Sequence, residues 1–445
     1  MENNHTPKIM MKRSNLLLPL VMLLLITIGL TISCEDPISS NPDPVFKDPN
    51  FELLIREVLD KPEGEITAED MLSITELNGS GRGITNISGI EYCTNLTELY
   101  MSVNCSGGSI GISDITPLSG LTNLTHLVLN SDQNLDISSI SGLTNLTSLY
   151  MWDSQISDIT PLSGLTNLTD LSLRRNQIND ISPLSGLTNL TRLGLERNQI
   201  SDISPLSGLT NLTDLSLRRN QIIDISPLSG LTNLTRLGLD INLISDISPL
   251  SGLTNLTSLE LSGNLVIDIT SLSGLINLTW LGLSGNKISD IPLLSDLTSL
   301  TNLNLSRNQI IDIAPLEEFS KLVIIDLGNN QISDIDPLAG LTNLQWLWLY
   351  ENQISDISSL SGLTSLTRLS LDTNQVSDID PLAGLNNLKE LRLESNQIVD
   401  IKPLVDNTGF GGGEYVYLNS NPLSDTSITV YIPQLRDRGV NVECC

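Results

Sequence analysis

The chain has 445 residues, a formal net charge of −28 and only 3% aromatic residues. A surface this negative repels phosphate backbones and anionic lipid headgroups, so the composition argues against nucleic-acid binding. The length alone suggests two or three domains, but an internal repeat allows a single domain of this size.

Residues 1–33 have the features of a secretory signal peptide. Lys12 and Arg13 precede the apolar run NLLLPLVMLLLITIGLTIS, and Cys34 follows it. The sequence LTISC resembles a bacterial lipobox, in which the cysteine becomes lipid-modified and N-terminal after cleavage. The alternative is an uncleaved anchor, because the run is long enough to span a bilayer. The polar residues directly after Cys34 favour the lipoprotein, and residues 34–46, rich in Pro, Ser and Asp, predict a flexible tether.

Residues 47–70 predict a helical N-terminal cap. Phe51, Leu54 and Ile55 recur at helical spacing, and they predict an apolar face. The sequence TAED at residues 67–70 has the pattern of a capping box and predicts a second short helix.

A repeat of 22 residues occupies most of the chain. Residues 121–406 divide into 13 such blocks without insertion, and LTNLTRLGLERNQISDISPLSG at 187–208 is representative. Positions 1, 4, 7, 9, 14, 17 and 20 of a block are nearly always aliphatic. Positions 7 and 9 point to one side of a short strand, and positions 6, 8 and 10 point to the other side. Stacked coils therefore predict an α/β solenoid with a parallel sheet.

The predicted solenoid covers residues 71–428 in about sixteen coils, and residues 429–445 form a C-terminal cap. The pattern L-x-x-L-x-L-x-x-N is the leucine-rich repeat signature. With DISPL in each block, the repeat closely resembles that of internalins, bacterial surface proteins with leucine-rich repeats. The segment KPEGEITAEDMLSITEL also resembles their helical cap. The resemblance implies a curved sheet with short helical or 3-10 turns on its convex side.

Two polar columns accompany the repeat. Asn at position 12 is expected to satisfy backbone groups of adjacent coils. Asp at position 16 could form a calcium column, but one carboxylate per coil supplies too few oxygens for a calcium cage. The column is better explained by caps on the short turns that follow it.

The rare aromatic residues concentrate at positions 6, 8 and 10. All four Trp and five of the seven Tyr lie there. We interpret this concave face as the ligand-binding surface, although Trp and Tyr are also good strand formers. The candidate binding residues are Tyr100, His126, Tyr150 and Trp152 near the N-terminal end, Trp280, and Trp346, Trp348, Tyr350, Tyr415 and Tyr417 near the C-terminal end.

Charged residues fill the same face between the two aromatic groups. Position 6 reads Asp170, Arg192, Asp214 and Arg236 in four successive blocks, and position 10 reads Arg174, Glu196, Arg218 and Asp240. Alternating signs on neighbouring strands predict ion pairs within the chain, so this strip is not expected to be a site for a polyanion.

The sequence does not suggest an enzyme. After removal of residues 1–33 a single histidine, His126, remains, and no phosphate-binding loop or metal-ligand spacing occurs. We expect no cofactor and no metal, a monomer, and an exported lipoprotein at the outer membrane or cell surface that touches the membrane only through its lipid.

The leading hypothesis for function is a protein partner bound on the concave face, and the alternative is a glycan stacked on Trp and Tyr. The chain has no LPxTG motif and no room for an immunoglobulin-like domain, so the resemblance does not carry a host-invasion role. The sequence does not decide whether Cys93 and Cys105, or Cys444 and Cys445, form disulfides.

Overall fold

The computed structural model describes residues 43–102, 111–291 and 296–444. The predicted signal peptide, the lipidation site Cys34, most of the tether, Cys105 and Cys445 lie outside these ranges. In the described ranges, no helix is both long and apolar enough to cross a membrane.

A parallel sheet runs through the repeat region. Each strand pairs with the strands of the preceding and following coils, and Leu77 therefore aligns with Leu99 and Leu99 with Leu127. In the described part of the chain the sheet has 17 strands. They are β1 (Glu76–Asn78), β2 (Glu98–Met101), β3 (His126–Asn130), β4 (Ser148–Trp152), β5 (Asp170–Ser172), β6 (Arg192–Gly194), β7 (Asp214–Ser216), β8 (Arg236–Gly238), β9 (Ser258–Glu260), β10 (Trp280–Gly282), β11 (Asn302–Asn304), β12 (Ile324–Asp326), β13 (Trp346–Trp348), β14 (Arg368–Ser370), β15 (Glu390–Arg392), β16 (Tyr415–Tyr417) and β17 (Asn441–Glu443).

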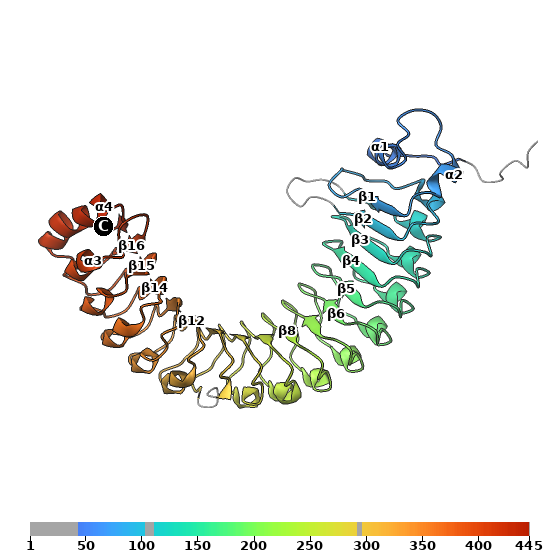
Figure 1. Cartoon of the computed structure of the whole chain (residues 1–445). Coiled ribbons are helices and arrows are strands. Elements are labelled where there is room, and N and C mark those ends of the chain that lie inside the picture. The colour runs from blue at the N-terminus through green and yellow to red at the C-terminus, as the bar shows by residue number, and fades with distance from the viewer. Residues whose placement is uncertain (1–42, 103–110, 292–295, 445) are drawn as a thin grey trace, which may run out of the picture. The chain divides into compact units, whose positions relative to one another are not determined.

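Short 3-10 turns return the chain from one strand to the next. Figure 1 shows that, in the described repeat region, they follow one side of the stack and the strands follow the other, inner side. The turns are η1 (Ile90–Tyr92), η2 (Thr116–Leu118), η3 (Ser138–Ile140), η4 (Thr160–Leu162), η5 (Ser182–Leu184), η6 (Ser204–Leu206), η7 (Ser226–Leu228), η8 (Ser248–Gly252), η9 (Thr270–Leu272), η11 (Ala314–Glu318), η12 (Asp336–Leu338), η13 (Ser358–Gly362) and η14 (Asp380–Leu382).

Helices close both ends of the stack. α1 (Pro49–Val58) buries Phe51, Leu54 and Ile55, and α2 (Ala68–Met71) begins with the predicted capping box between Thr67 and Asp70. At the other end lie α3 (Lys402–Asp406), the π-helical turn η15 (Ser427–Tyr431) and α4 (Ile432–Asp437). β17 follows α4 and pairs with β16, so the sheet has one strand more than the sixteen coils expected. The sequence did not predict β17, because its one apolar residue, Val442, lies between two polar residues and belongs to no repeat block.

The core is one continuous column of mostly aliphatic side chains from positions 1, 4, 7, 9, 14, 17 and 20 of the blocks. Cys93 belongs to this core, and burial raises the pKa of its thiol to about 12. The Asn column forms the expected ladder. Asn198 donates from Nδ2 to the carbonyl oxygens of Leu173 and Leu195, both at 3.0 Å, and its Oδ1 accepts from the N–H of Ile178 at 3.1 Å. Buried backbone groups of two coils are thereby satisfied.

The Asp column caps the turns. Asp180, for example, accepts from the N–H of Ser182 at 2.8 Å, and most other coils repeat this bond. Their carboxylates are therefore already used by the backbone of their own turns.

Candidate functional site

The strand face opposite the core carries the aromatic side chains. In β13 the buried Leu347 alternates with Trp346 and Trp348, which are half-buried. Trp280 is 43% exposed and Tyr415 is 50% exposed, and the other candidate residues are half-buried. The period of two along each strand thus places the rings where the sequence predicted them.

The N-terminal aromatic residues lie on β2, β3 and β4. The hydroxyl of Tyr100 donates to Glu98 Oε2 at 2.7 Å, and this bond raises the pKa of Tyr100 to about 12. Tyr150 meets Trp152 edge to face with ring centroids 6.3 Å apart. His126 is held by its neighbour, with Nδ1 3.0 Å from the Thr125 hydroxyl. Val128 separates Tyr100 from Tyr150 in the register of the strands. These residues share one face of the sheet, on three adjacent strands.

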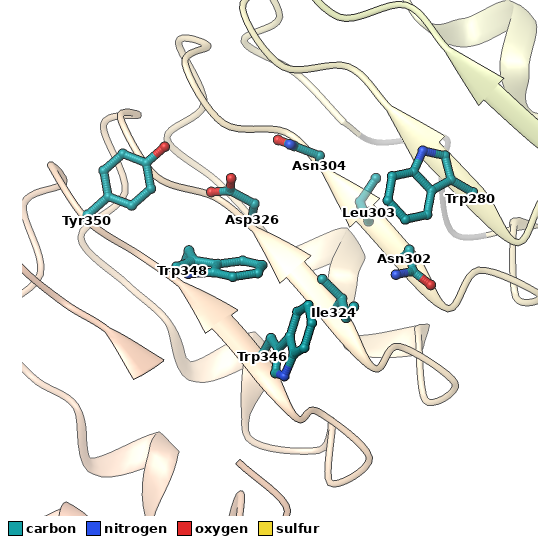
Figure 2. A pocket seen from close by; sticks show the side chains of 9 residues that line it. All are labelled: Trp280, Asn302, Leu303, Asn304, Ile324, Asp326, Trp346, Trp348 and Tyr350. Carbon is teal, nitrogen blue, oxygen red and sulfur yellow. The ribbon is translucent and has the colours of Figure 1, made fainter. Parts of the chain in front are cut away.

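Farther along the sheet, aromatic residues enclose a pocket of about 370 Å³. Figure 2 shows Trp280 on one side and Trp346, Trp348 and Tyr350 on the other, with shorter side chains between them. The lining residues are Trp280, Asn302, Leu303, Asn304, Ile324, Asp326, Trp346, Trp348 and Tyr350. The cause is a size pattern across four coils. Large rings on β10 and β13 stand at the ends of a gap because β11 and β12 carry small or medium side chains.

Two glycines let the neighbouring side chains take their positions. A Cβ on Gly328 would lie 2.2 Å from the Tyr350 ring, so only glycine lets that ring lie over the preceding coil. A Cβ on Gly282 would lie 2.0 Å from Glu260 Oε2, where the carboxylate reaches across to accept from the indole N–H of Trp280. Burial raises the pKa of Glu260, and the hydrogen bond from Trp280 lowers it by less.

Asp326 brings a carboxylate to the same pocket. Its Oδ1 accepts from the N–H of Gly328 at 3.0 Å. Burial raises the pKa of Asp326, and the backbone of Gly328, the Ser306 hydroxyl and the positive charge of Arg307 offset only part of that rise. The carboxylate is therefore poorly stabilised by the protein itself.

The C-terminal aromatic residues do not form one group. Tyr415 and Tyr417 stack on each other with centroids 6.5 Å apart, on β16, and β14 and β15 separate them from Trp346 and Trp348. Arginines from those intervening strands cover part of the rings. The guanidinium of Arg368 lies 4.6 Å from the Trp346 ring centroid, and that of Arg392 lies 4.8 Å from the Tyr417 ring centroid. The residue that lines the pocket together with Trp346 and Trp348 is Trp280, and not Tyr415 or Tyr417.

Six of the eight charged residues in the middle of the face form ion pairs with one another, whereas the described structure shows no ion pair for Arg174 or Glu196. Arg192 pairs with Asp170, Arg218 pairs with Asp240, and Arg236 Nη1 lies 3.9 Å from Asp214 Oδ2. Arg174 lies 5.2 Å from the ring centroid of Trp152. A ligand would have to break these contacts before it could use the charges.

Sequence reasoning missed the residues between the rings. Asn302, Asn304, Ile324 and Asp326 were not proposed as site residues, and neither were the two glycines. Comparing positions 6, 8 and 10 across four successive blocks, instead of within each block, would have shown the gap between Trp280 and Trp346.

The chain belongs to the leucine-rich repeat family. The family model described as Leucine Rich repeats (2 copies) matches it repeatedly, and the overlapping matches span residues 144–274, 276–340 and 342–406. Internalin-like leucine-rich repeat proteins are non-catalytic, and the chain has repeats of this type.

Within that family the chain is similar to Listeria internalins. An internalin (inlF) from Listeria monocytogenes is 34% identical, with a TM-score of 0.59, and the match covers 87% of this chain and 98% of the internalin. The functional domain of InlJ from Listeria monocytogenes is 23% identical with a TM-score of 0.60, covering 84% of this chain and 81% of that one. A leucine-rich repeat protein of Leptospira interrogans is 23% identical with a TM-score of 0.67, covering 84% and 97%. These last two show the shared fold alone. A comparison with curated proteins finds no match.

Proposed function

We propose that the chain is a bacterial cell-envelope lipoprotein that recognises a protein partner through the inner face of its sheet. The pocket between Trp280 and Trp348 carries this proposal. Large aromatic rings around a concave surface supply the buried anchors on which protein recognition depends. The likeness to internalins adds support, and the lipobox-like sequence before Cys34 supplies the expected anchor.

The alternative ligand is a surface glycan. Flat indole faces beside Asn302, Asn304 and Asp326 offer the stacking surface and the hydrogen-bonding groups that a sugar ring uses. Hydroxyl groups could bond to the two amides and the carboxylate without any charge on the ligand. This alternative keeps the same pocket and changes only the class of ligand.

A capture experiment with the immobilised protein distinguishes a protein partner from a glycan ligand. We expect the wild-type protein to retain one or more proteins from bacterial or host surface extracts, and the Trp348→Ala protein to lose them. Arg218→Ala, a change in the self-paired strip, is the matched control and should retain them. A glycan array run in parallel should stay blank. If the wild-type protein binds a saccharide and Trp348→Ala abolishes that binding, the ligand is a glycan and not a protein. If Trp348→Ala and Arg218→Ala capture the same amount of protein, the pocket is not the binding site.

A further inference from the structure

The aromatic pocket has an unbalanced negative charge. Of the described residues that line it, Asp326 is the one with an acidic side chain, and none of them has a basic side chain. Its carboxylate is stabilised by the N–H of Gly328, the Ser306 hydroxyl and the charge of Arg307, but burial has the largest influence on its pKa, which is raised. The charge of Arg307 is the weakest of these influences on the pKa of Asp326. A positively charged group entering the pocket would relieve this unfavourable burial.

The rings around Asp326 are suited to a planar cation. In the described parts of the chain, arginines of the protein lie over Trp152, Trp346 and Tyr417. Among the described residues, no arginine lies over Trp280 or Trp348, and both rings face the pocket (Figure 2). The hydrogen bond from the Trp280 indole N–H to the Glu260 carboxylate increases the electron density of that ring. Attraction between a cation and the ring face grows with that density.

Given a protein partner, the geometry points to an arginine side chain of that partner as the group the pocket receives. The aliphatic stem would pack on Ile324 and Leu303, and the guanidinium would stack on Trp348 and pair with Asp326. Arginine fits better than lysine because its planar group can stack on an indole and bind a carboxylate through two N–H groups. The net charge of −28 would also attract a basic segment from a distance. A sugar would leave the charge of Asp326 uncompensated.

The test uses short capped peptides as probes and the tryptophan fluorescence of the full chain as the readout. The peptide Gly-Arg-Gly is compared with Gly-citrulline-Gly, in which a neutral group of the same shape replaces the guanidinium. The variant is Asp326→Asn. It should fold, because Asn304 holds the equivalent position in the preceding coil and accepts the equivalent N–H bond, from Ser306 at 3.0 Å. Asp336→Asn, an exposed position on η12 of the same coil, is the matched control.

We expect the arginine peptide to bind about tenfold more tightly than the citrulline peptide. A charge-assisted hydrogen bond contributes a free energy that corresponds to about a tenfold change in affinity. Asp326→Asn should abolish the difference, and Asp336→Asn should preserve it. Equal binding of both peptides to the wild-type protein, no binding of either, or an unchanged preference in Asp326→Asn would overturn the assignment to arginine. The proposed function survives those results if Trp348→Ala still abolishes capture of the protein partner. If Trp348→Ala leaves capture unchanged, both proposals fail.

Discussion

In the blocks that span residues 143–406, position 11 adopts a left-handed backbone conformation. Gly263 and Gly285 accept it without strain at φ 69° and 65°, and Asn329 tolerates it at φ 54°. Ile241 takes the same conformation at φ 57°, although its branched side chain clashes with the backbone there. The repeat imposes this strain, because the turn after each strand requires the conformation whatever residue is present.

Replacing Ile241 by Asn should therefore stabilise the protein. We expect the free energy of unfolding to rise by about 1 kcal/mol, since asparagine tolerates the left-handed region that a branched residue resists. Urea denaturation measures the change. Ile223→Asn is the control, because Ile223 is also exposed, at 62%, and has no positive φ. An equal gain from both substitutions would show that loss of exposed apolar surface, and not backbone strain, is the cause.

The turns and the strands respond to acid in opposite directions. At the turns, the N–H and then the hydroxyl of Ser204 lower the pKa of Asp202, and Ser248 acts in the same way on Asp246. On the strand face, burial raises the pKa of Asp240, Glu260, Asp326 and Glu394. A carboxyl with a lowered pKa stabilises the fold above its ordinary value, and this contribution disappears as the pH falls through the lowered value. A carboxyl with a raised pKa destabilises the folded protein while it is ionised. Its protonation, as the pH falls, removes this destabilisation.

The melting temperature should consequently pass through a maximum in mild acid. We expect it to rise as the pH falls from neutrality towards the raised pKa values of the buried carboxyls, and to drop at lower pH, where the turn carboxyls with lowered pKa values become protonated. Glu260→Gln should raise the melting temperature at neutral pH and reduce the rise in acid. Calorimetry over this range checks both. A melting temperature that falls steadily from pH 7 would mean that the turn caps alone govern the response.

The strands and turns followed from the sequence because the aliphatic positions repeat without insertion. β17 was missed because its only core residue, Val442, stands alone between polar residues and belongs to no repeat block. The pocket could be predicted only in part. Alternation along one strand places Trp348 on the open face, but the space beside it depends on what Asn302, Asp326 and Gly328 leave empty in other coils. Tyr415 and Tyr417, near Trp348 in coil order, are separated from it by the two strands that carry Arg368 and Arg392.

The molecule as a whole combines an acidic repeat domain with a predicted lipid attachment at Cys34. Lipid on this residue would hold a highly charged protein at a membrane whose surface it would otherwise avoid. Cys34→Ser should leave the precursor unprocessed or release the protein from the membrane fraction, because no thiol would remain to carry the lipid. Mass spectrometry and membrane fractionation measure this. Unchanged mass and unchanged fractionation would favour an uncleaved anchor or another mode of attachment.

The central claim, that the aromatic pocket displays its rings for a ligand, is tested most directly by the affinity of Trp348→Ala for the captured partner, measured together with its melting temperature. We predict that binding weakens by about 2 kcal/mol or more, as expected for a buried aromatic anchor, and that the melting temperature barely changes. Arg218→Ala should weaken binding by less than about 1 kcal/mol, because its side chain is already paired with Asp240. Unfolding of Trp348→Ala would show that the rings are structural, and a larger loss in Arg218→Ala would place the site in the charged strip.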